Sequence, residues 1–208
     1  MDIRLNFINR SGDANNSQIL IFGKNPQASL DEIAQAWTAI PAFARDATYS
    51  VHYPIETAIT AQDSFGNFTA MQPAAPGQHF SLVEGEDGNI LEAPVAGQPD
   101  QITLSNELRQ GAANVCLYKG KRLYLSERNV LPEQTAAFRL RPTIWVGVAS
   151  QSDPDSGDNS AILSSVATKF SLLGLVSADV VMTGGGIGAN AEPLVFMLEN
   201  IVTAWSEG

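Results

Sequence analysis

The chain contains two histidines, His52 and His79, and either could act as a general base. His52 lies in an alternating stretch with aromatic neighbours, and His79 follows a Pro-Gly turn. No Gly-x-Ser-x-Gly motif supplies a nucleophile, and nothing in the sequence links either histidine to a serine or an aspartate. We therefore expect each histidine to occupy a turn or strand, and a cofactor-free enzyme with a histidine base is one alternative function.

Three aspartates, Asp153, Asp155 and Asp158, lie close together in a stretch rich in turn residues. Carboxylates grouped in this way can hold Ca²⁺ through hard oxygen ligands, which makes the three residues candidate metal ligands. The EF-hand spacing is absent, however, and no glutamate closes the loop at its twelfth position. Two histidines and one cysteine are too few for a structural zinc site. We expect a polar surface turn here and no cofactor.

A glycine-rich stretch, Gly184 to Ala189, has the form G-x-G-x-x-A and follows a predicted strand over 178–182. A dinucleotide-binding site also needs a helix that begins at the glycines, so that its N-terminus meets the pyrophosphate. A strand-like sequence follows from Leu194 instead. The pattern predicts a hairpin loop whose glycines permit positive φ, and it argues against nucleotide binding.

Aromatic side chains offer a different chemistry, because an exposed ring can stack on a sugar or anchor a protein partner. Tyr49 and Tyr53 flank His52, and Trp205 lies near the C-terminal end of the sequence. The candidate ligand-binding residues, for a carbohydrate or protein ligand, are Tyr49, His52, Tyr53, His79 and Trp205.

The composition limits the partners. The formal net charge is −10, from 22 acidic and 12 basic residues, and such a surface repels phosphate backbones. No nucleic-acid partner is expected. The single cysteine, Cys116, lies in an apolar run and is predicted to pack as a small buried side chain. The first residues lack the basic start and apolar core of a signal peptide, so we expect a soluble protein that is cytoplasmic, or exported without a classical signal peptide.

The spacing of apolar residues indicates strands nearly throughout. Residues 3–9 alternate apolar and polar side chains, and residues 18–22, apolar after Gln18, predict a strand that is buried on both faces. Hairpin turns are predicted at 64–67, 86–89 and 119–121. Short strands at this spacing predict an all-β fold, an antiparallel β-sandwich.

One short helix is predicted near residues 29–40. Ser29 and Glu32 form a capping box, apolar residues recur on one helical face, and Pro41 stops the run. The same residues also alternate acceptably as a strand, so both interpretations stay open.

Two stretches, 3–24 and 102–121, resemble each other: each has a strand, a turn and an apolar strand that ends in a Gly-Lys pair. Such an internal repeat predicts two similar β-sandwich halves, 1–98 and 99–208, within one domain or two. Chance similarity between ordinary hairpins is the alternative interpretation.

The missing catalytic and metal-binding patterns favour a non-enzymatic binding or self-assembly protein. Long strands with few charges leave sheet edges available for another copy, so we expect a homo-oligomer. A second alternative is a pore-forming or membrane-active toxin. It would insert an amphipathic hairpin from 160–183, a run with two charged residues and many Ser, Thr and Ala.

Overall fold

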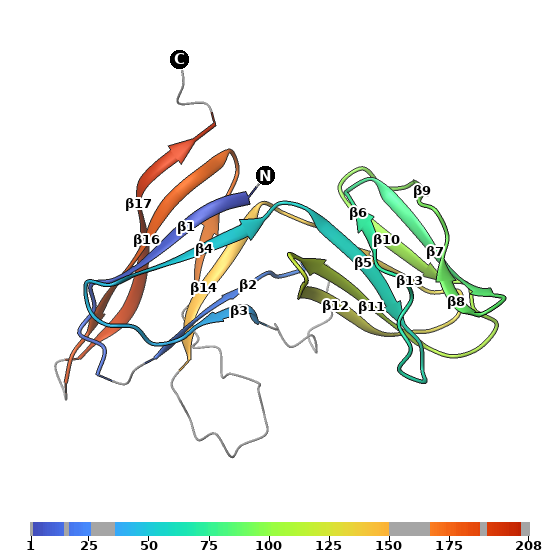
Figure 1. Ribbon diagram of the computed structural model, residues 1–208, viewed down its shortest axis with the longest axis horizontal. Coiled ribbons are helices and arrows are strands. Elements are labelled where there is room, and N and C mark those ends of the chain that lie inside the picture. The colour runs from blue at the N-terminus through green and yellow to red at the C-terminus, as the bar shows by residue number, and fades with distance from the viewer. Residues whose placement is uncertain (1, 15–16, 26–35, 150–166, 188–190, 205–208) are drawn as a thin grey trace. The chain divides into compact units, whose positions relative to one another are not determined.

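A computed structural model describes residues 2–14, 17–25, 36–149, 167–187 and 191–204. Every regular element in these ranges is a β-strand, which confirms the all-β, sandwich-like fold (Figure 1). None of the described segments is a helix long and apolar enough to cross a membrane. The chain divides into two compact units: the first comprises Met1–Gly23, Gln35–Ile55 and Pro142–Gly208, and the second comprises Lys24–Ala34 and Glu56–Arg141.

The first unit contains two four-stranded sheets, in the orders β17-β16-β1-β4 and β15-β14-β2-β3. β1 pairs with β16 in parallel, and the other pairs are antiparallel. The predicted alternation of β1 is confirmed, since Ile3, Leu5 and Phe7 are buried between exposed or half-buried neighbours. The strands are β1 (Asp2–Asn9), β2 (Gln18–Phe22), β3 (Ala36–Ile40), β4 (Thr48–Pro54), β14 (Thr143–Ala149), β15 (Thr168–Ser171), β16 (Leu175–Gly185) and β17 (Glu192–Thr203).

The second unit also contains two sheets, in the orders β13-β10-β7-β8 and β12-β11-β5-β6, with β9 added to β7. β7 and β10 are parallel. Its core includes Phe80, Leu104, Leu117 and Phe138, none of which is exposed. The strands are β5 (Thr57–Gln62), β6 (Gln72–Ala74), β7 (Gln78–Gly85), β8 (Gly88–Leu91), β9 (Val95–Ala96), β10 (Ile102–Asn106), β11 (Ala113–Lys119), β12 (Arg122–Val130) and β13 (Thr135–Phe138).

The three predicted hairpin turns are confirmed. The turn between β11 and β12 has two central residues, Gly120 and Lys121, with φ of 53° and 67°. Two positive φ values are what a tight turn needs to match the twist of its strands. β7 and β8 pair up to Gly85 and Gly88. In the third turn, the Gly66 N–H donates to the carbonyl of Asp63 at 3.1 Å.

The predicted helix near 29–40 is wrong over its second part, because residues 36–40 form β3; residues 29–35 lie outside the described residues. β3 pairs with the buried strand β2 and buries Trp37 and Ile40. Their spacing suits one helical face as well as a strand with a register shift, and β3 has such a shift beside Phe22. Pairing with β2 therefore selects the strand over the helix.

The two units are both assembled from separate stretches of chain. The first unit uses three stretches and the second uses two. Residues 97–100, where the sequence predicts two similar halves to meet, lie within the second unit. The internal repeat and the division into 1–98 and 99–208 stay predictions.

Candidate functional site

The edge of the first unit formed by β17 is the candidate site. β17 has 12 residues, more than any other strand in the described residues, and lies at the end of its sheet order. β16 is its one strand neighbour within the part of the chain that the structure describes. The backbone groups on the outer side of such a strand can pair with another strand.

The side chains of β17 are unusually apolar for an edge strand. Between residues 193 and 203 the sequence has one charged residue, Glu199. Its carboxylate lies 3.0 Å from Nη1 of Arg10 on the same unit, which offsets its charge. The exposed apolar side chains of the strand are Val195 (41% exposed), Met197 (43%), Ile201 and Val202.

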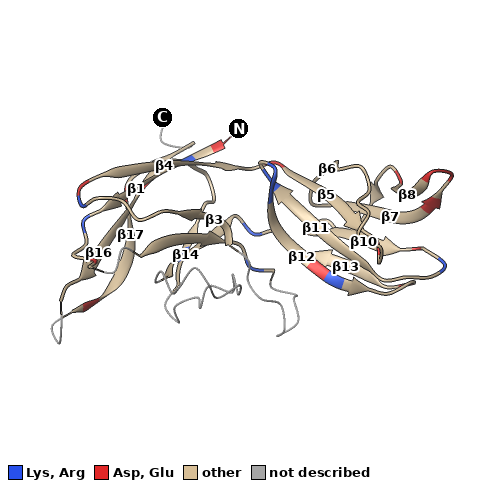
Figure 2. Cartoon of the chain, turned by 60° about the horizontal axis from the view of Figure 1, so that its bottom comes forward, with Lys and Arg blue, Asp and Glu red and all other residues tan. Residues whose placement is uncertain are grey.

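β12, an edge strand of the second unit, shows the contrasting design. It carries Arg122, Glu127 and Arg128 within nine residues, and Figure 2 shows a red and a blue segment side by side on it, whereas β17 is largely tan. Charges on an edge strand oppose pairing with another sheet. β17 lacks this protection over most of its length.

A row of polar side chains crosses the solvent-facing side of the same sheet and connects all four strands. The Ser50 hydroxyl donates to Oδ1 of Asn6 at 2.9 Å, and Nδ2 of Asn6 donates to Oδ1 of Asp179 at 2.8 Å. Nδ2 of Asn200 donates to Oδ2 of Asp179 at 2.7 Å. The amide donors of Asn200 and Asn6 hold the pKa of Asp179 below its usual value of 3.8. This row ties β17 to the rest of its sheet.

Changing Asp179→Asn should lower the free energy of unfolding by about 1 kcal/mol at neutral pH, since the two amides lose a charged acceptor that is largely exposed to water. The pKa is lowered in the folded state, so the stabilisation is present above pH 3.8 and is lost as the pH falls through the lowered pKa. Urea unfolding at neutral pH and at about pH 3 measures this. Glu56→Gln, an exposed acid outside the row, is the control; equal effects of the two variants would contradict the prediction.

The structure places three of the predicted ligand-binding residues on β4. Tyr49 is exposed, with its ring 6.3 Å from that of Phe43. His52 is exposed opposite Arg4 of β1. Tyr53 is buried and packs edge-to-face on Trp37, with the ring centroids 5.2 Å apart. Only Tyr49 and His52 are therefore open to solvent, and ligand binding by the three stays a prediction.

His79 belongs to the second unit, on β7, where its Nδ1 lies 2.8 Å from the Thr103 hydroxyl. Trp205 and the candidate metal ligands Asp153, Asp155 and Asp158 lie outside the described residues. Within the described residues, no group of three or more His, Cys, Asp or Glu side chains could hold a metal ion.

The segment proposed for membrane insertion, 160–183, divides in two. Residues 160–166 lie outside the described residues. From 168 onward it forms β15 and most of β16, which pair in different sheets of the first unit. The toxin alternative and the enzyme alternative stay predictions.

The glycine-rich stretch ends β16, as a hairpin loop requires. Gly184 has a φ of 87°, and a Cβ there would lie 2.1 Å from the carbonyl oxygen of Pro193 on β17. The Gly12 N–H donates to the carbonyl of Gly184 at 2.8 Å, and the Gly186 N–H donates to that of Gly12 at 2.9 Å. The backbones of these segments approach so closely that a side chain at Gly184 would not fit, which explains why this position is glycine.

The sequence predicts a strand over 194–202 but does not indicate that this strand is an exposed edge. One signal was present: a long apolar strand with a single charge. Its place in the sheet depends on pairing between distant segments, since β16 lies between β17 and β1. Such order cannot be deduced from alternation alone.

No protein-family model, curated protein or solved structure matches this chain.

Proposed function

We propose that this protein is a non-enzymatic, self-assembling β-sandwich protein whose copies join through β17. The observation that carries the proposal is the exposed edge of β17, with its apolar side chains and, after Glu192 at its start, one charge that Arg10 offsets.

A second copy is the partner that best matches this edge, because β17 is complementary to itself. In an antiparallel pair of two β17 strands centred on Phe196, Val195 of each copy lies opposite Met197 of the other. Glu199 then lies opposite Pro193, and no two acids face each other. The pair covers apolar surface and extends the sheet across the two-fold axis without a like-charge contact, although the whole chain carries a net charge of −10.

The test is the state of association in solution. Sedimentation velocity over a range of concentrations should show a dimer or a larger assembly of the unaltered chain. Met197→Lys should weaken association at least about tenfold, because an ammonium group would be desolvated against Val195 of the second copy. A strict monomer at every concentration overturns the proposal.

Ile90→Lys is the matched control. Ile90 is also exposed on an edge strand, β8, but belongs to the second unit, so this variant should associate like the unaltered chain. Hydrogen exchange supplies a second measurement: amides of β17 should gain protection as the concentration rises. Equal loss of association in both variants would assign the effect to added charge rather than to β17, and would contradict the proposal.

A further inference from the structure

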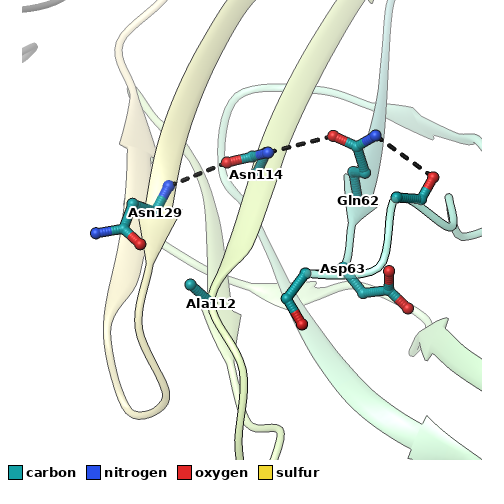
Figure 3. A pocket seen from close by; sticks show the side chains of 7 residues that line it. Gln62, Asp63, Ala112, Asn114 and Asn129 are labelled. Atoms are coloured by element: carbon teal, nitrogen blue, oxygen red, sulfur yellow. Dashed lines mark hydrogen bonds between the residues drawn. The ribbon is translucent and has the colours of Figure 1, made fainter.

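The second unit contains a polar hollow of about 330 Å³, a volume at the small end of ligand pockets. It lies between the turn that follows β5, the residues that lead into β11, and the end of β12. Figure 3 shows the amide groups of Asn129, Asn114 and Gln62 in a row along it. The lining residues are Gln62, Asp63, Ser64, Gly66, Ala112, Asn114 and Asn129.

A chain of hydrogen bonds fixes the orientation of these amides. The backbone N–H of Asn129 donates to Oδ1 of Asn114 at 3.1 Å, and Nδ2 of Asn114 donates to Oε1 of Gln62 at 3.2 Å. Nε2 of Gln62 donates to the carbonyl of Gly66 at 3.4 Å. Each amide nitrogen carries a second proton and each amide oxygen a second lone pair, so both amides can still bind a ligand.

Two further groups in the hollow have no hydrogen-bond partner among the described residues: the Ser64 hydroxyl and the side-chain amide of Asn129. Asn129 has a φ of 58°, a left-handed conformation. Residues other than glycine adopt it at some cost in strain, although asparagine tolerates it better than most. Apart from the Asp63 carboxylate, the hollow therefore presents its donors and acceptors on neutral side chains.

The charges of the lining argue against an anionic ligand. No lysine, arginine or histidine lines the hollow, so nothing in it would offset a phosphate or a carboxylate. The one acid, Asp63, already accepts hydrogen bonds within its own turn, from the N–H groups of Phe65 and Asn67 at 2.9 Å and from Nδ2 of Asn67 at 3.1 Å. These donors lower the pKa of Asp63, most strongly the side chain of Asn67.

The turn that Asp63 holds also carries two exposed aromatic rings. Phe65 is 88% exposed and Phe68 is 55% exposed. An aromatic ring in water beside fixed amide groups is typical of surfaces that stack on the apolar face of a sugar ring while hydrogen bonds hold its hydroxyls. The exposed ring of Phe65 is therefore free to make such a contact.

We propose that this hollow, which is lined in part by the turn that carries Phe65, binds a neutral saccharide unit. Each sugar hydroxyl both donates and accepts a hydrogen bond, which matches the side chains of Gln62, Asn114 and Asn129 and the Ser64 hydroxyl. The absence of cations in the lining sets the preference for an uncharged sugar. This site belongs to the second unit and does not depend on the assembly of β17.

The test is an NMR titration with neutral disaccharides: lactose, maltose, cellobiose, mannobiose and diacetylchitobiose. At least one should shift the side-chain amide resonances of Gln62, Asn114 and Asn129. The paired change Ser64→Ala and Asn129→Gly should weaken that binding at least about tenfold; glycine keeps the positive φ, so the fold is retained. A sulfated disaccharide should bind no more tightly than its neutral form.

Two controls separate the hollow from its surroundings. Gln98→Ala truncates an exposed amide elsewhere in the second unit and should leave the affinity unchanged. Phe65→Ala should weaken binding several-fold, whereas Leu131→Ala, another exposed apolar residue of this unit, should not. Failure of every disaccharide to shift the amides at millimolar concentration overturns the proposal, and so does binding that survives the paired change.

Discussion

Asn106→Ala should lower the free energy of unfolding of the second unit by about 3–5 kcal/mol. Asn106 is 0% exposed, and its Nδ2 donates to the carbonyls of Gly111 and Val130 at 3.0 and 2.8 Å. Its Oδ1 accepts the N–H of Leu108 at 3.1 Å. The alanine variant leaves these three backbone groups without their partner, and each such loss in a buried site costs about 1–3 kcal/mol. Because relaxation and water entry recover part of this loss, we expect a total in the lower part of the summed range.

The measurement should distinguish the two units. All three tryptophans belong to the first unit, so tryptophan fluorescence reports its unfolding, and hydrogen exchange in β10 to β13 reports the second. Ser105→Ala is the control, since this exposed hydroxyl pairs with that of Thr135 and its loss should cost less than about 1 kcal/mol. A loss below that value for Asn106→Ala would show that the three backbone groups find other partners.

The second large effect is a pH dependence that originates at Lys119. This lysine is 6% exposed, and its Nζ lies 5.3 Å from the ring centroid of Tyr124. Burial lowers the pKa of Lys119 from 10.5 to about 8. Between these two values the unfolded chain holds more protons than the folded one, so stability rises with pH. The unaltered chain should therefore gain on the order of 3 kcal/mol relative to Lys119→Met between pH 8 and pH 10.5.

Urea unfolding across this range measures the difference. Burial also raises the pKa of the Cys116 thiol, which lowers stability at high pH, but this contribution is common to both proteins and cancels. Lys121→Asn is the control: Lys121 is exposed in the adjacent turn at a φ of 67°, which asparagine tolerates. A pH dependence that is the same with and without Lys119 would refute the assignment.

Local patterns predicted much of the fold. The alternation over residues 3–9 correctly predicts which side chains of β1 are buried, because one face of that strand packs on the core. The turn around Gly120 is correctly predicted because glycine readily adopts positive φ, although Lys121 adopts it as well. The helix predicted near 29–40 is wrong where β3 forms. A short apolar segment fits the helical and the strand periodicity equally well, and pairing with β2 selects the strand.

Long-range pairing is what the sequence did not reveal. β1 and β16 are separated by most of the chain yet pair side by side, and the sequence of neither segment indicates that the other is its partner. The polar hollow of the second unit also depends on pairing between distant segments. Gln62 and Asn114 become opposite partners only through the register of β5 against β11, and Asn129 reaches them from a third strand. Isolated Asn and Gln residues carry no signal that they will meet, so the sequence pointed instead to histidines, tyrosines and aspartates.

The parallel pairing of β1 with β16 sets an order of events during synthesis. Every stretch of the second unit precedes residue 142, so that unit can complete its sheets while the rest of the chain is still being translated. β1 is synthesised long before β16, so one of its two edges stays unpaired until β16 emerges. The pair of β1 and β16 is thus completed only after the whole second unit has been synthesised, and slow translation after residue 141 would delay it.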